Sequence, residues 1–255
     1  MSEPLGLEIN RRSDVERIVL TTGDQTGGSG AGENGDDDAG QSWVDIRRNF
    51  LVDPDGVFIR TLEQTPWATS EIWRYEKYVE EKRLGAWLKP DDLEPAIRQT
   101  GLHLESTYRV RFSGVAAILY RDGNDFQGLH ADREMKWLDD TLIAILVLGE
   151  RRPFLLRPRG NWLDRENRGD PSNDVEIDPG RGDLIVMGGR AQRDWLHGVP
   201  ASDTSRPRIS VTWRWSSRRG RPDTAPGYTE GRHFSDATRN GGARQPGRRI
   251  RRPPA

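Results

Sequence analysis

Three side chains able to bind a metal stand out in this sequence: two histidines and one aspartate. His130 and Asp132 lie in the segment YRDGNDFQGLHADRE, and His197 lies in DWLHGVP. Two imidazoles and one carboxylate hold a ferrous ion in non-haem oxygenases and leave coordination positions open. Alternate residues of a strand share a face, so a strand ending here would turn His130 and Asp132 to the same side. His197 would complete the set if its strand folds opposite.

Two arginines in the segment RPRISVTWR add a second chemical element. Arg208 and Arg214 alternate, together with Ser210 and Thr212, with the apolar residues between them, so a strand here would turn its polar groups to one face. A guanidinium directed into a protein interior needs an anion, and a carboxylate can meet it with two hydrogen bonds. A dicarboxylic cosubstrate fits this demand. The alternative is an ion pair with a protein acid, such as Asp183 or Asp132.

Other metal-binding residues are scarce. The chain has no cysteine, which excludes disulfides, thiolate metal sites and cysteine nucleophiles. We expect packing or solvated roles for the remaining histidines, His103 and His233. Structural roles also remain open for the three candidate ligands: a turn histidine for His130, a helix cap for Asp132 and a half-buried hydrogen-bonding residue for His197.

The elements that must position these residues are short β-strands. After residue 108, runs of β-branched and large apolar residues are separated by Gly, Pro, Asn and Asp, which is typical of strands and turns. The sequence predicts eight strands, at residues 115–120, 128–130, 141–148, 153–158, 174–177, 183–187, 195–199 and 208–215. No helical period separates them. This pattern favours a mainly β protein with flanking helices, in which a double-stranded β-helix (jelly roll) carries an N-terminal helical region packed outside.

Two helices are predicted before the strands. The first begins at Ser70 and covers the segment SEIWRYEKYVEEKRLG. The second begins near Asp91 or Asp92, with Pro95 in its first turn and four apolar residues on one side, namely Leu93, Ile97, Leu102 and Leu104.

The two ends of the chain differ from the middle in composition. Residues 1–41 hold nine acids against three bases, and residues from 216 onward hold ten bases against three acids. We predict a disordered acidic, Gly-rich head over 1–41, one domain over 42–217 with its jelly-roll core at 112–216, and a disordered basic tail over 218–255. The polar segment 160–173 is either a functional loop or an unstructured insertion. Without an apolar leader or a membrane-length apolar run, we expect a soluble cytoplasmic monomer that does not bind membranes.

The motifs of the chain resemble a known family, the AlkB-type Fe(II)/2-oxoglutarate dioxygenases that repair alkylated nucleic acids. The resemblance runs from about Arg83 to Trp215. Its core is F-x-x-V-x-x-x-x-Y-R-D-G-x-D-x-x-G-x-H-x-D at 112–132. It continues with L-G-x-x-R-x-F-x-x-R at 148–157, GDLIVMGG at 182–189, W-x-H-G-V-P at 195–200 and R-I-S-V-T-W-R at 208–214.

The resemblance implies a role for each matching position. The implied iron ligands are His130, Asp132 and His197. The implied 2-oxoglutarate contacts are Tyr120, Arg208, Ser210 and Arg214. The implied substrate-side residues are Arg83, Trp87, Glu134 and Arg157. For a base turned out of the nucleic-acid stack, aromatic residues are the usual receivers, and the candidates are Trp87, Tyr75 and Trp137.

The sequence also departs from the family pattern. Ile118 stands where the family usually has Asn, and Ser210 stands where it often has Asn, so hydrogen bonds to the cosubstrate are weakened or lost. The segment LKPDDLEPAI replaces the family's aromatic Y-x-Y-S-G segment, which belongs to the lid over the base.

These features together imply an oxidative demethylase that uses Fe(II), 2-oxoglutarate and dioxygen. Its substrates would be bases of the N1-methyladenine and N3-methylcytosine type in DNA or RNA, and its products would include formaldehyde and succinate. A hydroxylase of a small molecule, lipid or protein on the same fold is the first alternative. A noncatalytic jelly-roll binding module is the second, and the candidate triad and both arginines argue against it.

Overall fold

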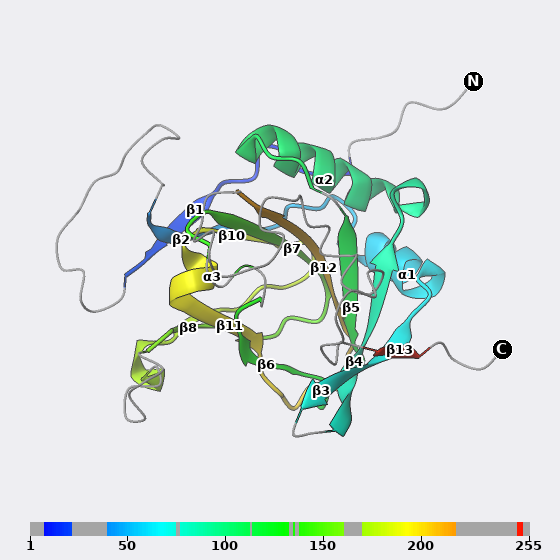
Figure 1. Cartoon of the computed structure of the whole chain (residues 1–255). Coiled ribbons are helices and arrows are strands. Elements are labelled where there is room, and N and C mark those ends of the chain that lie inside the picture. Colours follow the sequence, from blue (N-terminus) through cyan, green and yellow to red (C-terminus); the bar gives the residue numbers. More distant parts are fainter. Residues whose placement is uncertain are drawn as a thin grey trace.

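Two antiparallel sheets form the framework of the chain in a computed structural model, which describes residues 8–21, 40–74, 77–112, 114–132, 135, 138–160, 170–217 and 249–251. The larger sheet has the strand order β1-β2-β10-β7-β12-β5-β4-β3-β13, and the smaller has the order β6-β11-β8-β9. Figure 1 shows helices α1 and α2 on the side of the larger sheet that faces away from the smaller one.

The strands of the larger sheet come from the whole length of the chain. They are β1 (Glu16–Leu20), β2 (Ser42–Arg47), β3 (Ala68–Arg74), β4 (Lys77–Leu88), β5 (Val115–Tyr120), β7 (Thr141–Gly149), β10 (Leu184–Gly189), β12 (Arg208–Ser216) and β13 (Arg249–Arg251). The smaller sheet holds β6 (Gln127–His130), β8 (Phe154–Pro158), β9 (Val175–Ile177) and β11 (Trp195–Val199). The helices are α1 (Pro54–Gln64), α2 (Pro95–Tyr108) and α3 (Ala191–Asp194), with 3-10 turns η1 (Pro90–Asp92) and η2 (Pro171–Asn173).

Two buried apolar clusters occupy the two faces of the larger sheet. One lies between this sheet and the helices, and it joins Ile97 and Leu104 of α2 to Val211 and Trp213 of β12. The other lies between the two sheets, where Ile145 of β7 shares a cluster with residues of the smaller sheet such as Phe154 and Trp195. Burial on both faces explains why β7 reads as an unbroken apolar run rather than as an alternating one.

All eight predicted strands are present, and each lies within two residues of its predicted bounds. The mainly β fold with helices packed outside is confirmed. The alternation predicted for residues 208–214 is also present, because Ile209, Val211 and Trp213 belong to the helix-side cluster while Ser210 and Thr212 face a pocket on the other side.

The helix predicted from Ser70 is wrong. This stretch forms the antiparallel hairpin of β3 and β4. The prediction rested on the near-helical spacing of its aromatic and β-branched residues, but these residue types also suit strands. Pairing decides the matter, because Leu84–Leu88 of β4 hydrogen-bonds along β5 and extends the larger sheet.

The second predicted helix is confirmed as α2, with Pro95 at its first position. Glu94 caps it by accepting hydrogen bonds from the backbone N–H groups of Ala96 and Ile97, at 2.8 and 3.2 Å. Leu102 was expected on the buried side but is 60% exposed, since the buried face runs through Thr100 and Leu104 instead.

Helix α1 was not predicted. It starts at Pro54, and the Asp53 side chain accepts a hydrogen bond from the Gly56 N–H at 2.9 Å. An aspartate followed by proline is a good helix start, but Pro-Asp-Gly also reads as a turn.

The larger sheet extends into both predicted flanks. Strand β1 lies within the predicted disordered head and pairs with β2, and β13 lies within the predicted disordered tail and pairs with β3. For these residues the prediction of disorder is wrong, because sheet pairing supplies hydrogen bonds that composition does not reveal. The domain limits otherwise stay a prediction. No helix in the described part of the chain has the length and apolar character of a membrane span.

Candidate active site

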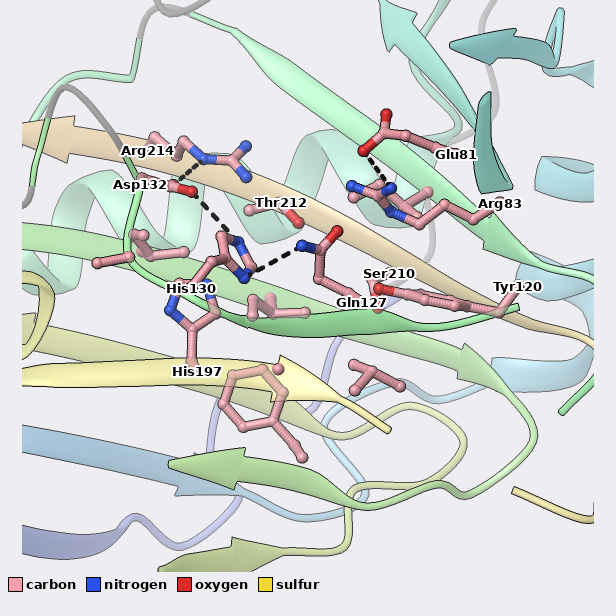
Figure 2. A pocket seen from close by; sticks show the side chains of 17 residues that line it. Glu81, Arg83, Tyr120, Gln127, His130, Asp132, His197, Ser210, Thr212 and Arg214 are labelled. Carbon is pink, nitrogen blue, oxygen red and sulfur yellow. Dashed lines mark hydrogen bonds and ion pairs between the residues drawn. The ribbon is translucent and has the colours of Figure 1, made fainter. Parts of the chain in front are cut away.

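A pocket of about 300 Å³ opens between the two sheets. The larger sheet supplies one wall through β4, β5, β7 and β12, and the smaller sheet supplies the other through β6, β8 and β11. The polar side chains that line it are Glu81, Arg83, Tyr120, Gln127, His130, Asp132, His197, Ser210, Thr212 and Arg214. Figure 2 shows these residues around one space, with the two histidines and Asp132 grouped at one end.

The three predicted metal ligands come together in this pocket. Strand β11 pairs with β6 so that His197 lies directly opposite His130, and their ring centroids are 4.3 Å apart. Asp132 follows two residues beyond His130, and its Oδ1 lies 3.6 Å from His130 Nε2. One ligand atom from each residue can be chosen so that all three lie within 4.8 Å of one another. Strand alternation and cross-strand pairing therefore build the cluster.

Local hydrogen bonds orient the His130 ring. Its Nδ1 lies 2.9 Å from the carbonyl oxygen of Gly128. A carbonyl oxygen only accepts, so this shorter contact favours a proton on Nδ1, whereas the Gln127 amide nitrogen at 3.2 Å could only donate to Nδ1. With the proton on Nδ1, Nε2 keeps its lone pair. The nitrogen that faces Asp132 is therefore the one that can bind a metal.

The charge states of the other two residues also suit a cation. Burial by itself would raise the pKa of Asp132, but the Arg214 guanidinium, and after it His130 and His197, hold that pKa well below its usual value. Burial, reinforced by His130 and opposed by Asp132, lowers the pKa of His197 to about 3. At neutral pH the pocket thus offers a carboxylate and an uncharged imidazole, which are the forms that bind metals.

The two arginines of β12 have different partners. Arg214 Nε donates a hydrogen bond to Asp132 Oδ2 at 2.7 Å, so the expected alternative of an ion pair with a protein acid holds for Arg214. It does not hold for Arg208. Asp183, the other acid considered, instead accepts from Arg48 Nη1 at 2.8 Å.

Arg208 is fully buried and poorly satisfied. Its Cζ lies 5.9 Å from the centroid of the Tyr120 ring, and among the described residues its one hydrogen bond is a long contact of 3.5 Å from Nη1 to the Arg152 carbonyl. Within the same part of the chain, its Nε and Nη2 have no partner, and the buried Ser210 Oγ has none either. Burial lowers the pKa of Arg208 to about 10, which leaves the guanidinium charged at neutral pH. A buried charge with free donors is costly unless a ligand such as a carboxylate meets it.

The predicted substrate-side residues are not all brought to the pocket. Arg83 lines it and is 8% exposed. Trp87 is 42% exposed and does not line the pocket. It lies near the pocket in the larger sheet, because Trp87 of β4 pairs with Ala116 of β5, and Ala116 pairs with the pocket residue Thr212 of β12. Arg157 lies on β8 and is held by Asp174, with two contacts of 2.6 Å. Glu134, Tyr75 and Trp137 lie outside the described residues.

Three polar residues near the site, Glu81, Gln127 and Gln192, were not predicted, and Thr212 was predicted to face inward but was given no role. Glu81 pairs with Arg83, Thr212 lines the wall, Gln127 Nε2 lies 3.2 Å from His130 Nδ1, and Gln192 contacts both Asp132 and His197. Thr212 shares the alternation of β12, so the sequence carried a signal for it. Gln192 lies in the polar run RAQRD, which carries no such signal.

The donor set fits a ferrous ion and 2-oxoglutarate. His130, Asp132 and His197 supply the ligand types of a non-haem iron site. The unpartnered nitrogens of Arg208 and the unpartnered Ser210 hydroxyl match the carboxylate of a dicarboxylic acid. Ile118 also lines the pocket and offers no hydrogen bond there.

Comparison with known proteins agrees with this chemistry. Residues 59–216 match the family model described as the 2OG-Fe(II) oxygenase superfamily. The chain is 28% identical over 180 residues to the Bos taurus protein named alpha-ketoglutarate-dependent dioxygenase alkB homolog 3, covering 64% of this chain and 62% of that protein. It is 28% identical over 129 residues to the Arabidopsis thaliana protein named DNA oxidative demethylase ALKBH2, covering 44% of this chain and 41% of that protein.

The human alkB homolog 3 is 27% identical over 198 residues, covering 71% of this chain and 66% of that protein, so the chain spans less than two thirds of these relatives. A Trichoplax adhaerens prolyl hydroxylase, solved with a hypoxia inducible factor peptide fragment, is similar in fold. Its TM-score is 0.50 at 15% identity, over 68% of this chain and 83% of that one. The matched family model spans more than half of the sequence, and with these relatives it shows that the chain belongs to the 2OG-Fe(II) oxygenase superfamily as an AlkB-type member.

Proposed function

We propose that this protein is an Fe(II)/2-oxoglutarate-dependent demethylase of alkylated nucleobases in DNA or RNA. The observation that carries the proposal is the juxtaposition of the His130, Asp132 and His197 cluster with the unpartnered donors of Arg208 and Ser210 in one buried region. The similarity to proteins named for alkB and for DNA oxidative demethylation supports the substrate class.

In this proposal the chain's residues divide between two tasks. His130, Asp132 and His197 hold the iron, while Tyr120, Arg208, Ser210 and Arg214 bind the cosubstrate. When bound, iron, 2-oxoglutarate and dioxygen supply the oxidising power that hydroxylates an N-methyl group, with succinate and carbon dioxide as coproducts and formaldehyde released as the base is restored.

The protein contributes charge, orientation and exclusion of water. Arg214 keeps Asp132 anionic, and the Gly128 carbonyl turns His130 Nε2 toward Asp132. The apolar residues Ile143, Ile145 and Phe154 close the floor of the pocket, so the reacting centre is screened from bulk water.

We place the substrate beside Glu81 and Arg83 of β4, across the pocket from the histidines of the smaller sheet. Arg83 Nη1 donates to Glu81 Oε1, and the Glu81 carboxylate also accepts from the Ser70 hydroxyl, so both charged groups are fixed before a ligand arrives. The buried Arg83 Nε has no partner among the described residues and can meet an acceptor on a base. Four residues along β4, Trp87 shares this face and exposes its ring for stacking.

Other predicted substrate contacts carry less support. Arg157 is committed to Asp174, so a direct role would require that ion pair to open. For Glu134, the proposed substrate contact rests only on the match to the AlkB-type motif. We also keep the expectation of a cytoplasmic monomer.

The experiment is a formaldehyde-release assay on oligonucleotides that contain N1-methyladenine or N3-methylcytosine, with succinate measured in parallel. The wild type should produce both products in equal amounts, and Asp132→Ala should produce neither. Arg83→Gln should retain 2-oxoglutarate binding but demethylate slowly. Succinate formation without formaldehyde from either oligonucleotide would reject the nucleobase substrate and favour a hydroxylase of a small molecule, lipid or protein.

A further inference from the structure

The side chain of Gln192 lies between two of the proposed metal ligands. Gln192 belongs to the single-turn helix α3, directly before β11, and is 1% exposed. Its Oε1 accepts a hydrogen bond from the backbone N–H of Asp132 at 3.0 Å, and its Nε2 lies 3.4 Å from His197 Nδ1. One amide therefore contacts a ligand that follows β6 and a ligand on β11.

We propose that Gln192 is a positioning residue of the metal site, which aligns Asp132 and orients the ring of His197. The inference rests on the proposed function in one respect, namely that His197 is a metal ligand. It adds a residue that the motifs do not mark. Among its neighbours in RAQRD, Arg190, Arg193 and Asp194 form ion pairs, and Ala191 is buried in the apolar cluster between the sheets.

The first part of the argument concerns Asp132. Its carboxylate is held by Arg214 through Oδ2, but its main chain lies beyond the end of β6 and outside the strand pairing. Gln192 supplies the acceptor that the Asp132 N–H lacks in the sheet. Holding both the backbone and the carboxylate fixes the direction of Oδ1, the oxygen near His130.

The second part concerns the His197 ring. Because Nδ1 faces Gln192, Nε2 is the nitrogen left for a metal, and a neutral ring that binds through Nε2 carries its proton on Nδ1. That N–H requires an acceptor. In the structure the amide nitrogen of Gln192 faces Nδ1, and an amide nitrogen only donates. Metal binding through Nε2 would therefore require the amide to turn until its oxygen, which already accepts from the Asp132 N–H, also accepts from Nδ1. Such partners of metal-bound histidines tune affinity substantially.

The same chain offers a matched control in Gln99. Its Oε1 also accepts a backbone hydrogen bond, from Glu8 N–H at 3.2 Å, but it lies on α2 and does not line the pocket. A purely structural role for Gln192 predicts that leucine at either position affects the fold and leaves the metal site alone.

The test is a Co(II) titration of the full chain, followed by visible absorption, which reports both affinity and ligand geometry. Gln192→Leu should weaken Co(II) binding about 10- to 100-fold and change the spectrum, because it removes both hydrogen bonds. Gln99→Leu should leave the affinity and spectrum of the wild type. Gln192→Glu should bind at least as tightly as the wild type, because a carboxylate accepts from both N–H groups.

Each outcome decides the proposal. A folded Gln192→Leu that binds Co(II) like the wild type overturns it. If the leucine variant does not fold, Gln192→Glu decides, and weak Co(II) binding by that variant overturns the proposal. Wild-type Co(II) binding that Asp132→Ala leaves unchanged would instead reject the metal site itself, and the positioning role with it.

Discussion

Arg152 and Arg208 are both buried beside the same ring, but only one of them is satisfied by the protein. Each is at most 1% exposed, and each places its guanidinium near Tyr120, with Cζ to centroid distances of 5.3 and 5.9 Å. Arg152 donates to three backbone carbonyls, those of Asp122, Asp125 and Pro200, at 2.7 to 3.0 Å. In the part of the chain that the structure describes, Arg208 has one hydrogen bond, at 3.5 Å, and two unpartnered nitrogens.

The difference separates a structural arginine from a ligand-binding one. Arg152 ties the turn after β5 to the segment after β11, and only its Nε lacks a partner. Arg208 carries the same charge at the same depth with its donors left open. Burial lowers the pKa of both groups, so neither burial nor pKa alone tells them apart. The two arginines differ in the number of protein acceptors that each one reaches.

The largest expected effect comes from removing the satisfied arginine. Arg152→Met leaves three carbonyls without their donor, and we expect it to lower the free energy of unfolding by about 3 kcal/mol or more. Urea denaturation of the metal-free protein measures this. Arg208→Met is the control and should be as stable as the wild type or more so, because it removes a poorly compensated charge. Equal destabilisation by both variants would break the comparison.

The second effect falls on ligand binding. Arg208→Met should weaken 2-oxoglutarate binding about 100-fold, because it removes charge-assisted hydrogen bonds worth about 3 kcal/mol. Calorimetry with Ni(II) in place of iron measures the affinity without turnover. Arg208→Lys should also bind poorly, since an ammonium group cannot reproduce the planar fork of donors. The exposed Arg206 serves as a control, and Arg206→Met should bind normally.

A smaller effect tests the residues beside Arg208. Ser210→Ala should weaken 2-oxoglutarate binding by about 2- to 10-fold, the value of one ordinary hydrogen bond, and Ile118→Asn should tighten it by a similar factor. The two changes lie opposite each other on paired strands, so opposite shifts in the same calorimetric titration would show that this part of the pocket contacts the cosubstrate. Unchanged affinity in both variants would place the cosubstrate elsewhere.

The smallest effect concerns His103, an ionisable side chain that is only partly buried. Burial, and then the charges of Arg47 and Arg11, lower the pKa of His103. The unfolded chain therefore takes up this proton at a higher pH than the folded one, and the free energy of unfolding should fall as the pH falls through the ordinary histidine range. His103→Gln should flatten this slope in denaturation curves taken between pH 7 and 5. An unchanged slope would show that partial burial has no such effect here.

Sequence reasoning performed best where chemistry and strand alternation coincided. The segment RPRISVTWR predicted its inward and outward faces, because a strand with an apolar cluster on one face and a polar pocket on the other must alternate. Proximity of His130 and His197 was predicted only conditionally, since sequence cannot state which strands pair. The register that places these two residues opposite each other is a tertiary property.

The failures have a common physical cause. The hairpin of β3 and β4 read as a helix because local spacing was considered without the edge of β5 to which β4 binds. Gln192 escaped notice because its importance depends on two residues distant in sequence. The contrast between Arg152 and Arg208 was equally invisible, since the carbonyls that satisfy one and not the other come from separate turns.

Strand β6 lies at the edge of the smaller sheet, where β11 is its one neighbour among the strands that the structure describes. It has four residues, and its register with β11 shifts just beyond His197. Such an edge opens locally at a lower free energy than a central strand, exposing its amides to exchange with solvent. An ion that joins His130 to His197 would act as a cross-link over that edge, so the free energy of local opening would rise with metal concentration. The metal site would then set how often the edge of the smaller sheet opens. Loss of metal would increase amide exchange in β6 before it affected the rest of the protein.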